Sequence, residues 1–327
     1  MSPATPTDGA ETFADVGEFA LISRLVRDLP AAPAVSVGPG DDAAVFLVNG
    51  SAVTSVDLLV EGVHFRSDWS SASDIGRKAV AVNVADLEAM GCEPLTMVIG
   101  LGAPASTTTQ WAREFMTGVR DEAELAGITL VGGDTTAADK LVVSVTAIGQ
   151  TGELAPVLRS GARPGDVVAI RGRLGWAAAG LTVLGRGFRS PRAAADAHRV
   201  PLVPYGAGRQ AALAGATAMV DVSDGLLADL GHVARASEVR IDLDRARIPV
   251  DEPLRVVATA MGGSDPLRFA LTGGEDHALA ATFPLGRVPE DWTVVGQVLE
   301  ADEDDPPVVL VDGQPWQDEA AGWQHFA

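Results

Sequence analysis

Helical spacing of apolar residues alternates along the chain with short apolar runs. In the first half, apolar positions recur every three or four residues over residues 18–29, 74–90 and 107–126, which predicts helices there. The middle helix is expected to have Ser73 as its N-cap and Gly91 just past its end. Short apolar runs predict strands at 43–48, 51–56, 94–101, 128–131 and 141–149. Asn49-Gly50 separates the first two strands and predicts a hairpin between them.

The same mixture starts again after a loop at residues 152–165. Helices are expected at 176–184, 206–213 and 226–236, and strands at 167–170, 218–222, 239–243, 277–283, 292–298 and 308–311. We therefore expect two domains, residues 1–150 and residues 151–327. Both mix helices with strands, which predicts an α/β or α+β fold.

The composition is that of an acidic globular protein. Apolar residues make up 47% of the 327 residues, and 44 Asp and Glu against 24 Lys and Arg give a net charge of −20. Broad binding to nucleic acid is therefore not expected, because phosphate backbones attract a positive surface. An acidic protein can still bind phosphates when divalent cations lie between the two. Cys92 is the sole cysteine, which excludes an intramolecular disulfide. Neither a secretory signal nor a membrane span is evident, so a cytoplasmic protein is expected.

Acidic residues stand in glycine-rich turns and at the ends of predicted strands. They are Asp41 and Asp42, Asp57, Asp86, Asp134, Asp221 and Asp224, and Glu275 and Asp276. Each alone is explained by a turn or a helix cap. Asp86 differs, because its small and apolar neighbours predict a buried carboxylate that must be paired or bound to metal. Taken together, these carboxylates favour Mg²⁺, and a polyphosphate opposite them would compensate their charge.

Two common nucleotide motifs do not account for this pattern. Residues 38–43 fit G-x-G-x-x-A, but a predicted strand rather than a helix follows them. The chain has no P-loop motif, and its lysines are Lys78 and Lys140 alone. Arg159 is read equally as a surface charge or a phosphate contact, while Cys92 is expected to be buried without a chemical role.

The acidic motifs, in this order, resemble the thiamine-monophosphate kinase family of the aminoimidazole ribonucleotide synthetase-like superfamily. The resemblance is carried by residues 40–43 (GDDA), 57–65 (DLLVEGVHF), 78–91 (KAVAVNVADLEAMG), 132–136 (GGDTT), 159–166 (RSGARPGD), 221–226 (DVSDGL) and 273–276 (GGED). It extends from about Glu18 to Phe326. It implies a two-domain α/β fold, an N-terminal domain that binds ATP and Mg²⁺ and pairs in a homodimer, and a mixed α/β C-terminal domain that completes the active site.

The resemblance also implies roles for individual residues. It implies magnesium ligands at Asp42, Ser55, Val56 (through its carbonyl), Asp57, Asp86, Asp134, Asp221 and Asp224, with Asp42, Asp86, Asp221 and Asp224 central to catalysis. Nucleotide contacts fall at Gly133, Asp134, Arg159 and Ser223, and contacts to the thiamine substrate at His64, Glu275 and Trp323. The implied reaction is direct, magnesium-assisted in-line transfer from ATP to thiamine monophosphate. The number of metal ions and a requirement for K⁺ stay open.

Other functions are kept as alternatives. A different member of the superfamily could act on another acceptor, although selenophosphate synthetase would need a reactive Cys or selenocysteine with a Lys near the N-terminus. A regulator that binds nucleotide or metal without catalysis is a further alternative. Intact acids at every expected metal position argue against it.

Overall fold

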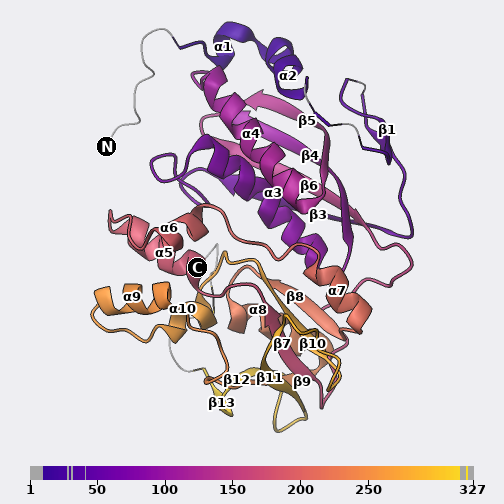
Figure 1. The fold of residues 1–327 in the computed structure, drawn as a ribbon, viewed down its shortest axis with the longest axis vertical. Coiled ribbons are helices and arrows are strands. Elements are labelled where there is room, and N and C mark those ends of the chain that lie inside the picture. Colours follow the sequence, from indigo (N-terminus) through magenta and orange to yellow (C-terminus); the bar gives the residue numbers. More distant parts are fainter. Residues whose placement is uncertain (1–9, 28, 31, 41, 317–321, 323–327) are drawn as a thin grey trace. The chain divides into compact units, whose positions relative to one another are not determined.

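The computed structural model describes residues 10–327 except 28, 31, 41, 317–321 and 323–327, and it contains two units (Figure 1). Unit 1 comprises Met1–Val84 and Pro94–Gln150, and unit 2 comprises Ala85–Glu93 and Thr151–Ala327. The chain thus passes between the units after Val84, after Glu93 and after Gln150. Both units combine helices with strands, so the predicted fold class is confirmed. No helix in the described residues is long and apolar enough to cross a bilayer.

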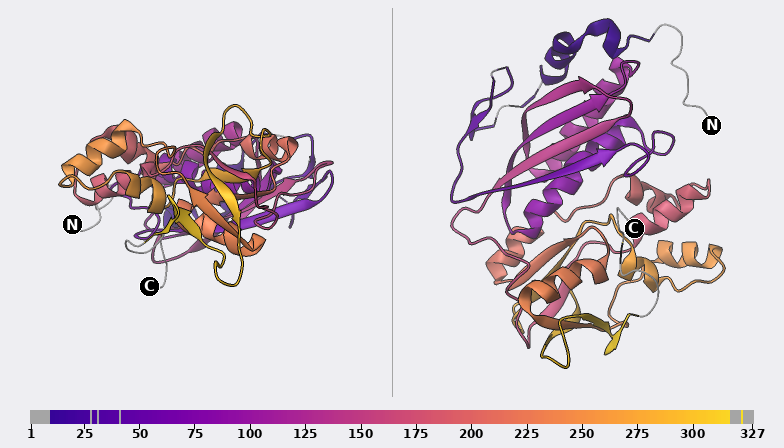
Figure 2. Two further views of the ribbon diagram at one scale, coloured as in Figure 1. Left: turned by 90° about the horizontal axis from the view of Figure 1, so that it is seen from below. Right: turned by 180° about the vertical axis from the view of Figure 1, so that it is seen from behind.

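Unit 1 is a four-stranded sheet with two long helices on one face (Figures 1 and 2). Its elements are α1 (Phe13–Val16), α2 (Glu18–Val26), β1 (Val35–Val37), β2 (Val45–Phe46), β3 (Ala52–Val60), α3 (Ala72–Ala89), β4 (Glu93–Ala103), α4 (Thr109–Ala126), β5 (Thr129–Ala137) and β6 (Val142–Gln150). The strand order is β3-β6-β4-β5, with β3 antiparallel to β6 and β4 parallel to β5. Helices α3 and α4 lie over one face, and the strands lie in front of them in the view from behind (Figure 2).

Helices α3 and α4 touch through their backbones. A Cβ atom added to Gly76 would lie 2.2 Å from the carbonyl oxygen of Phe115, and one added to Gly118 would lie 2.0 Å from that of Ser73. No side chain fits into either space, so a glycine is required on each helix for this close crossing. The crossing fixes the position of α3 on α4.

The hairpin predicted at Asn49-Gly50 is wrong. β2 pairs instead with β1 in a separate two-stranded sheet. β3 pairs with β6 over its full length, from Ala52 opposite Gln150 to Val60 opposite Val142. That long ladder satisfies far more backbone groups than a hairpin with two-residue β2 could, so the distant partner is preferred. Gly50, with φ 75°, still makes the predicted turn.

Two other predictions in unit 1 are corrected at their boundaries. Helix α3 starts after Ser71, not Ser73, because Ser71 and Asp74 form a reciprocal capping box: the Ser71 N–H donates to Asp74 Oδ2 (2.9 Å) and the Asp74 N–H to Ser71 Oγ (3.1 Å). The strand predicted to end at Val131 continues to Ala137. Asp134 therefore lies inside β5 and not in a turn after it.

Unit 2 is built on a seven-stranded sheet in the order β13-β12-β9-β11-β7-β10-β8. Its elements are β7 (Val167–Arg171), α5 (Trp176–Gly185), α6 (Arg192–Arg199), α7 (Ala207–Ala214), β8 (Ala218–Val222), α8 (Leu226–Ser237), β9 (Val239–Leu243), α9 (Glu252–Ala260), α10 (Leu267–Thr272), β10 (Ala278–Phe283), β11 (Thr293–Glu300), β12 (Val309–Val311) and β13 (Gln314–Pro315). The pairs are antiparallel except β12 with β9. The short helices α6, α9 and α10 were not predicted. Strands β8 and β10 are buried along their whole length, and Asp221 lies near the end of β8.

Candidate functional site

The candidate residues divide between the two units. Unit 1 contains Asp42, Ser55, Val56, Asp57, His64, Gly133 and Asp134, and unit 2 contains Asp86, Arg159, Asp221, Ser223, Asp224 and Glu275. Trp323 lies outside the described residues. Each unit is therefore described by itself.

The candidates on β3 lie on opposite faces of the sheet. Side chains alternate along a strand, so Ser55 and Asp57 lie on the partly covered face and Val56, 58% exposed, on the other. Asp57 is in the middle of β3 and not at its end. Its N–H donates to Oδ1 of Asn83 (2.9 Å), a side chain of α3 that is almost completely buried. Asn83 thus holds the backbone of the predicted ligand Asp57. An amide in an apolar helix was the sequence signal for it.

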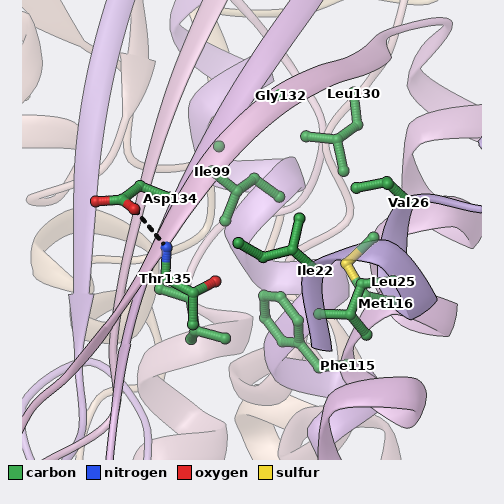
Figure 3. Close-up of a pocket in the computed structure, with 12 residues that line it drawn as sticks. Ile22, Leu25, Val26, Ile99, Phe115, Met116, Leu130, Gly132, Asp134 and Thr135 are labelled. Atoms are coloured by element: carbon green, nitrogen blue, oxygen red, sulfur yellow. Dashed lines mark hydrogen bonds between the residues drawn. The ribbon is translucent and has the colours of Figure 1, made fainter. Parts of the chain in front are cut away.

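Asp134 lies at the rim of an apolar pocket in unit 1. Side chains of α2 and α4 line the pocket, among them Ile22, Leu25 and Met116, and Gly132 to Thr135 of β5 complete it (Figure 3). The Asp134 carboxylate is exposed, points away from the apolar side chains, and accepts from the Thr135 N–H (2.8 Å). The pocket therefore combines an apolar wall with a carboxylate at one edge.

Gly133 allows β4 and β5 to approach each other at this pocket. A Cβ atom at Gly133 would lie 2.1 Å from the carbonyl oxygen of Ile99, its partner across the parallel pair. A side chain at this position would push the two strands apart. The structure thus gives Gly133 a packing role in addition to the nucleotide contact expected of it.

His64 is held by contacts of its ring and its carbonyl. The Val60 N–H donates to its Nδ1 (3.1 Å), and Lys78 Nζ donates to its carbonyl oxygen (2.9 Å). Lys78 is 1% exposed, so this lysine supports the loop from inside the unit. Its charge is not presented on the surface.

The end of α3 belongs to unit 2 and contains both Asp86 and Glu88. The expectation that Asp86 is buried is wrong: it is half-buried, and Glu88, two residues on, is 1% exposed. Glu88 accepts the N–H groups of Gly206 (2.7 Å) and Gly208 (2.8 Å) at the start of α7. Burial raises the pKa of Glu88, while these N–H groups oppose the rise. Glu88 thus fixes α7 against the end of the helix that carries Asp86.

The loop after β8 is held by a buried aspartate that the sequence did not single out. Oδ2 of Asp229, in the first turn of α8, accepts the N–H groups of Ser223, Asp224 and Gly225, each at 3.0 Å. Asp229 is 2% exposed, and burial, with a further contribution from Asp221, raises its pKa to about 7. Its position in the first turn of a predicted helix is the sequence signal by which Asp229 could have been found. Asp229 shapes the loop that carries Ser223 and Asp224.

Residues 273–277 form a second loop against the first. The Glu275 N–H donates to the Ser223 carbonyl (2.7 Å), and the His277 N–H to that of Val222 (2.8 Å). Glu275 and His277 have φ values of 68° and 51°, in the left-handed region that non-glycine residues rarely adopt. His277 Nδ1 lies 3.1 Å from Oδ2 of Asp221, and both side chains are buried. The two loops thus hold each other by backbone bonds and one side-chain contact.

Asp276 turns away from this contact and caps helix α5. Its carboxylate accepts the N–H groups of Gly175 and of Ala177 (2.9 Å). Burial raises its pKa to about 7, and the backbone N–H groups of α5 oppose the rise. This acid is therefore a structural cap.

Gly322 lies against the loop that carries Asp224, and Arg159 acts on the ring of His232. Burial lowers the pKa of His232, Arg159 lowers it further, and Asp224 opposes the change, so both charges act on the same ring. A Cβ atom on Gly322 would lie 2.6 Å from the Asp224 carbonyl oxygen, so the chain just before Trp323 packs against this loop. The Arg159 guanidinium is exposed.

The donor set fits Mg²⁺ chemically, without forming a complete protein site. No group of three or more His, Cys, Asp or Glu side chains in the described residues is arranged to hold a metal ion. Mg²⁺ usually takes one or two carboxylates and completes its coordination with water and substrate phosphates. Asp221 and Asp224 in one unit and Asp134 in the other are oxygen donors of that kind.

Comparison with known proteins gives matches over nearly the whole chain. Two family models match: AIR synthase related protein, N-terminal domain, at residues 40–151, and AIR synthase related protein, C-terminal domain, at residues 163–308. A thiamine-monophosphate kinase of Mycobacterium tuberculosis (strain H37Rv) is 49% identical over 96% of this chain and 93% of its own.

Solved structures agree. The thiamine-monophosphate kinase of Stenotrophomonas maltophilia K279a has a TM-score of 0.80 and 33% identity, covering 92% of this chain and 98% of that one. AaThiL complexed with AMPPCP and TMP has a TM-score of 0.78 and 30% identity, covering 95% and 98%.

Proposed function

The chain belongs to the AIR synthase related protein family, and we propose that it transfers the γ-phosphoryl group of ATP to the phosphate of thiamine monophosphate. The observation that carries this proposal is the nearly full-length match to thiamine-monophosphate kinases. AMPPCP is a non-hydrolysable analogue of ATP, so a relative solved with AMPPCP and TMP supports this donor and this acceptor. The products are ADP and thiamine diphosphate. ATP as the donor is compatible with the cytoplasmic location expected from the sequence.

The apolar pocket of unit 1 is the proposed site of the purine base. Its wall of Ile22, Leu25 and Met116 suits a flat, weakly polar ring, and the exposed Asp134 lies at its rim. A base in this pocket would direct its phosphates toward the segment of β5 from Gly132 to Thr135, which lines the pocket and carries Asp134.

Magnesium is proposed to be held by Asp42, Ser55, Asp57, Asp86, Asp134, Asp221 and Asp224, with the carbonyl of Val56. When bound, it would neutralise phosphate charge and orient donor and acceptor for in-line transfer. The chain's own part is to keep these oxygens in place: Asn83 holds the backbone of Asp57, and Asp229 holds that of Asp224. A requirement for K⁺ stays a separate question.

The acceptor needs no general base. Its phosphate is already anionic at neutral pH, and one of its oxygens forms a bond to the γ-phosphorus as the bond to the β–γ bridging oxygen of ATP breaks. The electron pair of the broken bond leaves with ADP. His64, Glu275 and Trp323 are proposed to bind the thiamine part. The packing of Gly322 on Asp224 supports a C-terminal residue near unit 2's candidate ligands.

A homodimer through unit 1 is part of the proposal. The uncovered face of its sheet presents Val56 and Leu58, 58% and 53% exposed, beside the half-buried side chains of β6. Exposed valine and leucine side chains on the open face of a sheet are typical of a surface that a partner covers. Leu58→Lys is expected to give monomers in light scattering. Leu125→Lys changes a leucine of α4 that is 62% exposed and should leave the dimer intact. A monomeric wild-type chain would contradict the proposal.

The direct test is to incubate the protein with ATP, Mg²⁺ and thiamine monophosphate and to measure thiamine diphosphate by chromatography. Product should form in proportion to the ADP released. Asp86→Asn, which keeps the size of the side chain, should abolish product while leaving the circular dichroism spectrum unchanged. If no thiamine diphosphate forms but another phosphorylated acceptor is consumed, the acceptor is wrong and the family stands.

A further inference from the structure

His277 contacts Asp221, one of the candidate metal ligands. Its Nδ1 lies 3.1 Å from Asp221 Oδ2, and its side chain and that of Asp221 are 8% and 5% exposed. An ionised carboxylate can only accept a hydrogen bond, so Nδ1 is the donor in this pair. The two residues come from adjacent antiparallel strands, since β10 begins directly after His277 and pairs Ala278 with Val222.

We propose that His277 is a positioning residue for the metal: it holds Asp221 through one carboxylate oxygen so that the other keeps a fixed direction. The inference rests on the proposed function, because it assumes that Asp221 binds the cation. Hydrogen-bonding partners behind a metal ligand typically change metal affinity or activity 10–100-fold when they are removed. The role asks of His277 only a donor at the Nδ1 position.

The backbone at His277 supports a specific role over simple filling of space. Its φ of 51° lies in the left-handed region, which only a few per cent of non-glycine residues adopt. The bond from its N–H to the Val222 carbonyl (2.8 Å) holds the residue in that conformation. This backbone conformation directs the imidazole ring of His277 toward the side chain of Asp221 on strand β8. A side chain that only filled space in the core would not require this left-handed backbone conformation.

The other buried acids of the region have different partners. Asp229 holds the N–H groups of residues 223–225, and Asp276 holds those of Gly175 and Ala177. Neither makes the contact to the Asp221 side chain that His277 makes. His277 is thus the residue whose change should alter Asp221 without removing a bond from the 223–225 loop.

The test compares three substitutions by Mn²⁺ binding, measured by electron paramagnetic resonance in the presence of AMPPCP. His277→Asn places an amide donor where Nδ1 lies, and Asn tolerates left-handed backbone. His277→Gln carries its amide one carbon further out, and His277→Phe keeps a ring without a donor. We expect the Gln and Phe variants to bind Mn²⁺ 10–100-fold more weakly, and the Asn variant to bind within about threefold of wild type.

The matched control is His198→Phe, a second buried histidine of unit 2, on α6. It should change the melting temperature without changing Mn²⁺ affinity. The proposal is overturned if the Asn and Gln variants bind Mn²⁺ equally well, a comparison that remains if the Phe variant does not fold. Failure of the wild-type protein to make thiamine diphosphate would instead contradict the proposed function. The Mn²⁺ measurement needs no thiamine acceptor and so separates the two failures.

Discussion

The two units present their candidate metal ligands in opposite ways. In unit 2, Asp221 is buried, and the loop with Asp224 is held by three N–H bonds to Asp229 and by the 273–277 loop. In unit 1, Asp134 is exposed on a strand, and its carboxylate accepts a hydrogen bond from the adjacent N–H of Thr135. In unit 2, the candidate ligands Asp221 and Asp224 are thus part of the buried, hydrogen-bonded structure. In unit 1, the sheet does not depend on the Asp134 side chain in order to fold. A substitution of Asp134 should therefore separate function from stability, whereas a substitution that disturbs the loop with Asp224 should change both.

Asp134→Asn should give the largest loss of activity with the smallest loss of stability. Loss of a carboxylate proposed to hold the Mg²⁺ that neutralises the transferring phosphates is expected to lower kcat/KM by roughly 10²–10³-fold. The side chain is exposed, so the melting temperature should stay within about 1 °C of wild type. Steady-state kinetics and thermal unfolding check both parts. Asp139→Asn, an exposed acid of the following turn, is the control that should change neither. Unfolding of the Asp134 variant would mean that unit 1 also depends on its ligand.

Asp229→Ala should lower activity less but destabilise the protein. Three N–H groups lose a charged acceptor inside the fold, which is expected to cost roughly 3 kcal/mol of unfolding free energy. The distorted loop should lower kcat/KM by about 10–100-fold. Urea unfolding and kinetics measure the two effects. Asp229→Asn keeps one acceptor oxygen and should lie between the alanine variant and wild type. Unchanged stability in Asp229→Ala would remove the contrast between the units.

Gly133→Ala tests whether unit 1 has its own structural requirement at the pocket. The added Cβ would lie 2.1 Å from the Ile99 carbonyl oxygen, and we expect a loss of about 1–3 kcal/mol in urea unfolding. The neighbouring Gly132→Ala places its Cβ 3.8 Å from Val98 and should cost less than about 0.5 kcal/mol. Equal losses for both variants would show that strand separation is not the cause.

Asp276→Asn should have the smallest effect on activity, and its effect on stability should depend on pH. Burial raises the pKa of Asp276 from its ordinary 3.8 to about 7 in the folded state. The folded chain therefore holds a proton that the unfolded chain has released. The stability this group contributes is present below about pH 4 and lost as pH rises through 7. The unfolding free energy of the variant minus that of wild type should therefore be larger at pH 8 than at pH 5, as measured by urea unfolding at the two pH values. A constant difference would contradict the raised pKa.

The sequence predicted the long helices and strands of unit 1, because long amphipathic helices and apolar runs have clear periods, and it missed the short α1 and β1. It failed where pairing is decided at long range: Asn49-Gly50 favours a local hairpin, but β3 finds its partner in β6, almost a hundred residues later. The short helices of unit 2 were missed for a related reason. α10, with six residues, is too short to show a period.

The sequence singled out the candidate acids, but not the buried side chains that contact them. Motif order located acids such as Asp134 and Asp224, since their glycine-rich contexts are visible in the sequence. The sequence did not single out Asn83, Asp229 and His277, which contact the candidate ligands Asp57, Asp224 and Asp221 respectively. Their roles depend on which N–H groups and carboxylates the fold brings within hydrogen-bonding distance, 2.9 to 3.1 Å in these contacts. Asp86 shows the converse error: apolar neighbours suggested burial, but it is Glu88 that faces the interior.

The glycine contact between α3 and α4 limits how this chain can change length during evolution. Gly76 fixes α3 against Phe115, and Asp86 follows about ten residues later, or roughly 15 Å along the helix. One inserted residue between them would rotate Asp86 by about 100° about the helix axis and move it on by about 1.5 Å. Insertions and deletions should therefore be absent from this segment in functional homologues. They should accumulate instead in surface turns such as 186–190 and 301–306.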